Sequence, residues 1–123
     1  MATPLRLLLV EDDPHDAELI VRRLQRAGFE VTWERVDTEA AYMEKIRAGF
    51  DLVILPPPAP GDPHYEAVVR TIRSHGLAML VCSAFHGAAT AILGDAEFLD
   101  KPFADQELIA ACERALARRN HVR

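Results

Sequence analysis

Short, nearly unbroken apolar runs alternate along this chain with segments in which apolar residues recur every three or four positions. Apolar runs of this length predict strands that are covered on both faces, and the helical spacing predicts amphipathic helices between them. We expect strands at Leu5–Val10, Leu52–Leu55, Leu77–Cys82 and Phe98–Leu99. Regular alternation of strand and helix predicts one α/β domain, with a parallel sheet and helices on both of its faces.

The segment Phe29–Glu34 differs from these runs, because its apolar residues alternate with polar ones. Alternation predicts a strand with one polar face, so we place this strand at an edge of the sheet. Helices are predicted after each of the first three strands and at the end of the chain. Capping residues such as Asp13 and terminal glycines such as Gly28 support their limits. Residues 88–93 predict at most a short helix.

Length and composition narrow the class of protein. The chain has 123 residues, which corresponds to one domain, and residues 118–123 fit the start of a linker. A formal net charge of −5 argues against a nucleic-acid surface, and no apolar run approaches the ~20 residues of a membrane span. Cys82 and Cys112 match neither a disulfide framework nor a zinc site and are expected to be inert core thiols. We therefore expect a cytoplasmic domain that binds neither nucleic acid nor a membrane.

The carboxyl ends of parallel strands meet at one edge of a sheet, and ligands bind there. The predicted strand ends at this edge carry Glu11-Asp12-Asp13, Pro56, Ser83 and Lys101. Carboxylates suit a hard cation such as Mg²⁺, while a hydroxyl and an ammonium suit phosphoryl oxygens. Such groups normally surround a carboxylate nucleophile on the central strand, where they offset the charge of an aspartyl phosphate.

The chain resembles the receiver domain of bacterial response regulators in four motifs that occur in the same order. They are Leu8-Leu9-Val10-Glu11-Asp12-Asp13, Phe50-Asp51-Leu52-Val53-Ile54-Leu55, Ser83-Ala84 and Lys101-Pro102-Phe103. The resemblance implies a doubly wound, flavodoxin-like five-stranded sheet with the strand order 2-1-3-4-5. It also implies a fourth helix that is short or absent, because the interval between Ser83 and Lys101 is shorter than in typical receivers.

The same resemblance implies roles for individual residues. Glu11 and Asp12 correspond to the acidic pair that holds Mg²⁺. Ser83 corresponds to the switch hydroxyl, Phe98 to the switch aromatic and Lys101 to the lysine that contacts the phosphoryl group. Each has a structural alternative: the acids form a solvated loop, Lys101 pairs permanently with Asp12, the hydroxyl bonds to backbone, and the aromatic ring belongs to the core.

The chain departs from this family at the position of the phosphorylated aspartate, which is Pro56 here. Proline has neither a nucleophile nor an ionisable group, so we expect no phosphoacceptor at the usual place and no enzymatic activity. The next residue, Pro57, also lacks the backbone N–H that a receiver offers to a phosphoryl oxygen. With one ligand lost, Mg²⁺ binding by Glu11 and Asp12 is expected to be weak or absent, and no other cofactor is expected.

Five of the eight residues from Pro56 to Pro63 are proline, which predicts a stiff, extended loop. Two interpretations of this loop remain open. It is either rigid filler beside a lost active site, or a preformed recognition surface made by Pro57, Pro58, Pro60 and Asp62. Asp62 lies six residues beyond Pro56 and is therefore not expected to replace the lost acceptor.

Together these features predict an atypical receiver module of two-component signalling that is not phosphorylated at the usual position. We expect it to act through contact with a signalling protein or with a second copy of itself. The alternative is a domain that binds a small molecule or phosphate in the same crevice, with Ser83, Lys101 and Asp12 as its contacts.

Overall fold

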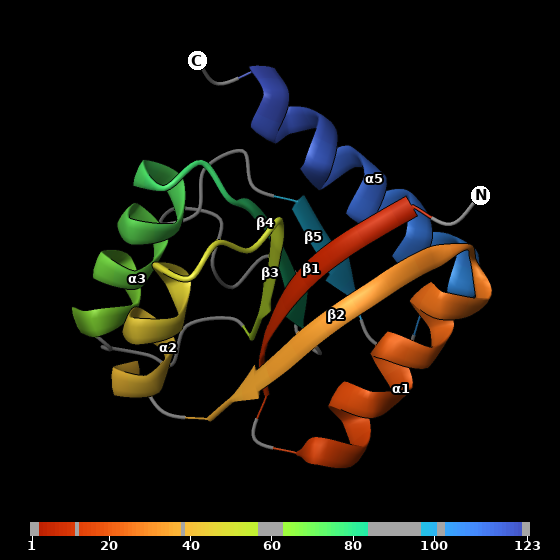
Figure 1. The fold of residues 1–123 in the computed structure, drawn as a ribbon, viewed down its shortest axis with the longest axis horizontal. Helices are drawn as coiled ribbons and strands as arrows, with labels where there is room; N and C mark the ends of the chain where they lie inside the picture. Colours follow the sequence, from red (N-terminus) through yellow and green to blue (C-terminus); the bar gives the residue numbers. More distant parts are fainter. Residues whose placement is uncertain are drawn as a thin grey trace.

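The five predicted strands form one parallel sheet in the computed structural model, which describes residues 3–11, 13–37, 39–56, 63–83, 97–100 and 103–121 (Figure 1). The strand order β2-β1-β3-β4-β5 confirms the predicted 2-1-3-4-5 topology. The strands are β1 (Thr3–Val10), β2 (Phe29–Val36), β3 (Leu52–Leu55), β4 (Ala78–Ser83) and β5 (Glu97–Asp100). The described helices are α1 (Pro14–Arg26), α2 (Glu39–Ile46), α3 (Pro63–Ser74) and α5 (Asp105–His121).

Helices cover both faces of this sheet, as the sequence predicts. Helices α1 and α5 lie on one face, and α2 and α3 lie on the other (Figure 1). The shortest of the four described helices is α2, with eight residues. The prediction of a short or absent fourth helix falls on residues 84–96, which lie outside the described residues, so the last helix keeps the label α5.

The central strands contribute alternate residues to two separate hydrophobic clusters. In β1, Leu7 and Leu9 pack toward α1 and α5, whereas Leu8 packs toward α2 and α3. In β3, Ile54 and Val53 divide in the same way. Because successive strand residues point to opposite faces, a sheet covered on both sides needs apolar residues at every position. The unbroken apolar runs are therefore a direct consequence of burial on both faces.

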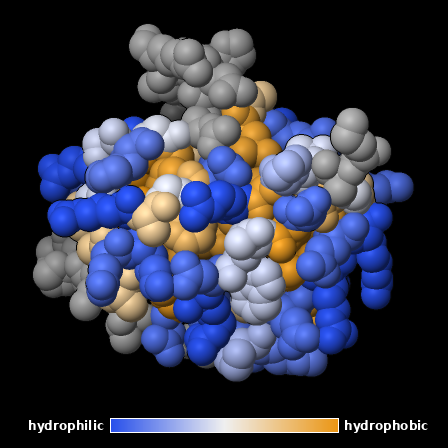
Figure 2. Space-filling view, viewed as in Figure 1, coloured by the Kyte–Doolittle hydropathy of each residue, from blue (hydrophilic) through white to orange (hydrophobic). Residues whose placement is uncertain are grey.

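Strand β2 lies at the edge of the sheet, as its alternating sequence predicts. Val31 and Trp33 are half-buried and pack against the cluster under α1 and α5, while Glu30 and Glu34 are exposed. Figure 2, drawn from the same side as Figure 1, shows hydrophilic side chains over much of this face and hydrophobic atoms between them. The strand continues to Val36, two residues beyond the predicted limit, and Val36 is buried in the cluster under α2 and α3.

Helix α5 carries the predicted apolar stripe, which includes Cys112, and Cys82 of β4 is buried in the same cluster. Leu108, Ala111 and Cys112 are fully buried, and Cys82 of β4 is 5% exposed. Burial raises the pKa of the Cys112 thiol to about 12, so this thiol stays protonated and unreactive at neutral pH. The predicted core position of the two cysteines is confirmed. None of the helices within the described residues is long and apolar enough to cross a membrane.

The buried central strand predicts a sharp difference between two leucine substitutions. Leu52→Ala in β3 removes a fully buried side chain and is expected to lower the free energy of unfolding by about 2–5 kcal/mol, because a cavity remains. Leu19→Ala on α1 is the matched control, since Leu19 is 39% exposed and should change stability by less than about 0.5 kcal/mol. Urea unfolding measures both, and equal losses would contradict the assigned burial.

Candidate functional site

The parallel sheet brings the predicted site positions to one edge. Glu11 follows β1, Pro56 follows β3, and Ser83 is the last residue of β4. Strands β1 and β3 are neighbours in the sheet, and Ser83 pairs with Asp100 at the end of β5. The four strand ends therefore share one edge, whereas Asp12 and Lys101 themselves lie outside the described residues.

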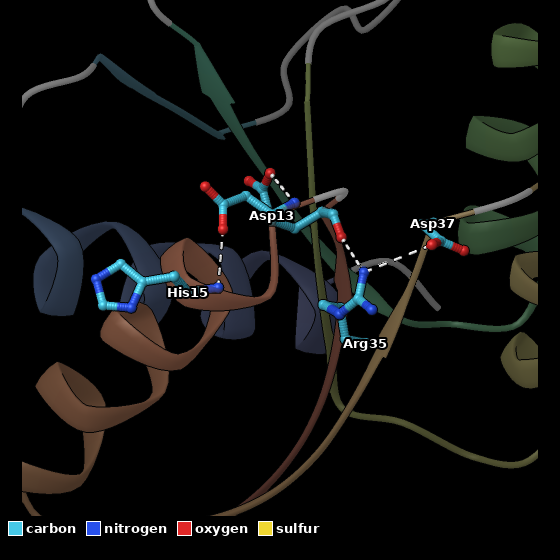
Figure 3. Close-up of polar contacts among 5 residues, drawn as sticks. Asp13, His15, Arg35 and Asp37 are labelled. Atoms are coloured by element: carbon cyan, nitrogen blue, oxygen red, sulfur yellow. Dashed lines mark hydrogen bonds and ion pairs between the residues drawn. The ribbon is translucent and has the colours of Figure 1, made fainter.

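Local hydrogen bonds order the turn from β1 into α1. The Glu11 carboxylate accepts the Asp13 backbone N–H at 3.1 Å, and the Asp13 carboxylate accepts the backbone N–H of His15 at 2.9 Å (Figure 3). Asp13 has an extended backbone conformation and is followed by Pro14 at the first helical position, as expected for an N-cap. The predicted capping role of Asp13 is confirmed. The same bonds commit both carboxylates to the backbone of this turn.

Arg35 at the end of β2 was not anticipated from the sequence, yet it reaches this turn. Its Nη1 atom donates to the backbone carbonyl of Glu11 at 2.9 Å and lies 3.7 Å from a carboxylate oxygen of Asp37 (Figure 3). The Glu11 backbone N–H in turn donates to the carbonyl of Val36 at 3.1 Å. The end of β2 thus holds Glu11 through both of its backbone polar groups. The available signal was an arginine directly beside the acidic strand ends of the predicted sheet.

The magnesium site that the family resemblance implies does not fit the described residues. Pro56 has no carboxylate to offer, and the carboxylate of Glu11 already accepts a backbone N–H. The positive charge of Arg35 lies against the same turn. Across the parts of the chain that the structure describes, no group of three or more His, Cys, Asp or Glu side chains could hold a metal ion. Asp12, the other predicted ligand, lies outside the described residues.

Phe98 is half-buried and packs against the cluster under α2 and α3. Together with residues of α5 that include Gln106, Ala110 and Arg114, it also lines an open groove between β5 and α5. Its packing agrees with the interpretation as a core residue. The predicted interaction loop of Pro57, Pro58, Pro60 and Asp62 lies outside the described residues, and helix α3 begins directly after it at Pro63.

Two further arginine contacts join the last helix to the rest of the fold. Glu97, at the start of β5, has a side chain that is only 10% exposed and pairs with Arg114 at 3.0 Å and Arg118 at 2.7 Å. A buried carboxylate needs such partners, because an unpaired charge in the interior is costly. The pattern of alternating apolar residues gave no sign of this buried acid.

Arg23 of α1 anchors the beginning of α5. Its guanidinium lies over the Phe103 ring at 5.3 Å from the centroid and donates to the Phe103 carbonyl at 3.2 Å. It also lies 3.3 Å from a carboxylate oxygen of Asp105. These contacts fix the turn that directly follows Lys101-Pro102 in the sequence.

Comparison with known proteins yields distant relatives, although no family model matches the chain. The chain is 34% identical over 121 residues to the transcriptional regulatory protein CusR of Escherichia coli strain K12, covering 93% of this chain and 52% of that protein. It is also 34% identical over 123 residues to SilR of Salmonella typhimurium, described as a probable transcriptional regulatory protein, covering 94% of this chain and 53% of SilR. The chain therefore spans about half the length of the curated relatives it matches.

Solved structures with the same fold share between 26% and 29% sequence identity with this chain. A response regulator receiver protein from Sinorhizobium medicae has a TM-score of 0.74 and 26% identity, and the match covers 94% of this chain and 97% of that one. A putative response regulator from Chloroflexus aurantiacus has a TM-score of 0.72 and 29% identity, and the match covers 94% and 100% of the two chains. The signal receiver domain of the putative response regulator NarL from Mycobacterium tuberculosis has a TM-score of 0.70 and 27% identity, with coverage of 94% and 98%.

The capping contact of Asp13 can be tested by substitution. Asp13→Ala removes the oxygen that accepts the His15 N–H and is expected to lower the free energy of unfolding by about 1 kcal/mol. Asp13→Asn keeps an acceptor at the same place and should remain within a few tenths of a kcal/mol of the unmodified protein. Urea unfolding compares the three proteins. If the asparagine variant were as unstable as the alanine variant, charge and not capping would explain the role of Asp13.

Proposed function

We propose that this chain, a response regulator receiver domain by its fold and its relatives, serves two-component signalling without phosphorylation at residue 56. The observation that carries the proposal is Pro56 itself, which lies directly after the central strand β3 at the shared edge of the strand ends. Its ring nitrogen is part of an amide and its side chain is saturated carbon. Phosphoryl transfer needs a nucleophile at that place, and proline supplies none.

The neighbouring carboxylates support the same conclusion. Glu11 and Asp13 accept backbone N–H groups of their own turn, and Asp37 lies in an ion pair with Arg35. Each of these carboxylates therefore has a local partner within the described residues. These contacts support a structural role for the described acids of this edge.

A receiver without its acceptor is expected to act by protein–protein contact and not as an enzyme. The partner is then another signalling protein or a second copy of this chain. The family resemblance places the usual partner contacts on the fourth helix, the fifth strand and the fifth helix, and the short interval between Ser83 and Lys101 departs from that arrangement. Within the described residues of this region, the ion pairs of Glu97 with Arg114 and Arg118 join α5 to β5. Under this proposal the domain keeps one state, and its partner or its abundance carries the signal.

The alternative, a crevice that binds a small molecule or phosphate, is less well supported. The relatives and the solved structures that the chain resembles are described as regulators and receivers. In the described part of the crevice, the polar groups of the β1–α1 turn are already bonded to one another.

Incubation with acetyl phosphate and Mg²⁺, followed by intact-mass measurement, tests the proposal. We expect the mass of the protein to stay unchanged, because residue 56 offers no oxygen nucleophile. Asp62→Asn is the control for an acceptor displaced into the proline-rich loop. A stoichiometric gain of one phosphoryl group in the unmodified protein would overturn the proposal. Loss of that gain in the asparagine variant would assign the acceptor to Asp62.

Introducing a carboxylate at residue 56 separates the effect of Pro56, which lacks a nucleophile, from that of Pro57, which lacks a backbone N–H. Pro56→Asp supplies an oxygen nucleophile and a metal ligand, so Mg²⁺ affinity should rise. Phosphorylation should nevertheless remain slow, because Pro57 still lacks the backbone N–H that would stabilise a phosphoryl oxygen. The additional substitution Pro57→Ala should then increase the rate. Equal rates for the single and double variants, measured by intact mass over time, would show that the missing N–H is unimportant.

A further inference from the structure

The end of β2 places a permanent positive charge among acidic residues. Arg35 Nη1 lies 2.9 Å from the carbonyl oxygen of Glu11 and 3.7 Å from the Asp37 carboxylate. Within the described residues, the two acids that contact this arginine at the strand ends are Glu11, through its backbone carbonyl, and Asp37, through its carboxylate. The Arg35 side chain is only 28% exposed. Its charge is therefore less screened by solvent than that of a fully exposed arginine.

A guanidinium at this place can do what a cation bound from solution would do. Arginine is charged at every physiological pH, and its planar fork donates to several oxygens at once. It contacts the Glu11 carbonyl directly, and a backbone carbonyl is also an oxygen ligand for hard cations. Like charges on adjacent residues repel, and a nearby cation reduces that repulsion. Unlike a metal ion, Arg35 is covalently part of the chain, so its presence at this place does not depend on a binding equilibrium.

We propose that Arg35 is the resident cation of this acidic strand end and replaces a divalent metal in holding the turn after β1. Its bond to the Glu11 carbonyl ties the edge strand β2 to that turn, and its charge offsets that of the Asp37 carboxylate.

A direct consequence is that Arg35 opposes the binding of Mg²⁺, since it repels a second cation brought to the same turn. Magnesium binding can be measured by titrating ¹⁵N-labelled protein with MgCl₂ at constant ionic strength and following the backbone amide signals of residues 10–13. The Pro56→Asp background makes binding strong enough to compare. The four proteins needed are Pro56→Asp alone and Pro56→Asp combined with Arg35→Met, with Arg35→Lys or with Arg22→Met.

We expect Arg35→Met to raise the Mg²⁺ affinity of Pro56→Asp by about 10-fold or more, because a neighbouring positive charge is removed. Arg35→Lys keeps the charge and should stay within about 2-fold of Pro56→Asp. Arg22→Met is the matched control for net charge. Arg22 is exposed and paired with Glu18 on α1, so its removal should also change affinity by less than about 2-fold. Unchanged affinity in the Arg35→Met protein would overturn the proposal.

A second measurement tests the holding role on the natural residue 56. In Arg35→Met alone, amide hydrogen exchange at Glu11 should become at least about 10-fold faster, because the tie between β2 and the turn is lost. Arg22→Met should leave that exchange unchanged. The amide spectrum shows directly whether each variant is folded. Unaltered protection in a folded Arg35→Met protein would sink the holding role. Neither readout involves phosphoryl transfer, so both are independent of whether the unmodified protein accepts a phosphoryl group.

Discussion

Burial of the sheet on both faces is the constraint on which the rest of this structure depends. Strands β1 and β3 divide their side chains between two clusters, with Leu7 and Ile54 under one helix pair and Leu8 and Val53 under the other. Apolar surface removed from water contributes roughly 25 cal/mol per Å², and these strands bury both of their faces. Parallel strands covered in this way require crossover helices, and the crossovers bring all carboxyl ends to one edge. The location of the candidate site follows from the location of the core.

At that edge, the side chain of residue 56, directly after β3, decides which chemistry the neighbouring strand ends can support. An aspartate after β3 would bring a nucleophile, a metal ligand and a negative charge together, whereas the side chain of Pro56 supplies none of them. The described acids of this edge have local partners. Glu11 and Asp13 accept backbone N–H groups, and Asp37 pairs with Arg35.

Arginines connect parts of this fold that are distant in the sequence. Arg35 joins the edge strand to the turn after β1, and Arg23 joins α1 to the start of α5. Arg114 and Arg118 of α5 both donate to Glu97 at the start of β5. Sequence patterns place each arginine on a strand or helix but do not reveal its partner. The partner of a long, flexible side chain depends on which groups the tertiary fold brings within its reach. This is why the capping role of Asp13 was predictable from its neighbours, whereas Arg35 and the buried Glu97 were not.

The sequence by itself determined the order of strands and helices, the edge position of β2, the N-cap at Asp13 and the presence of a proline, which has no nucleophilic side chain, directly after β3. Each of these rests on local spacing or on the identity of one side chain, and such properties are written along the chain. Only the tertiary structure decided which charges meet at the strand ends. Electrostatic contacts form across space between residues from different elements, and their energies depend on distances and burial that no linear pattern contains.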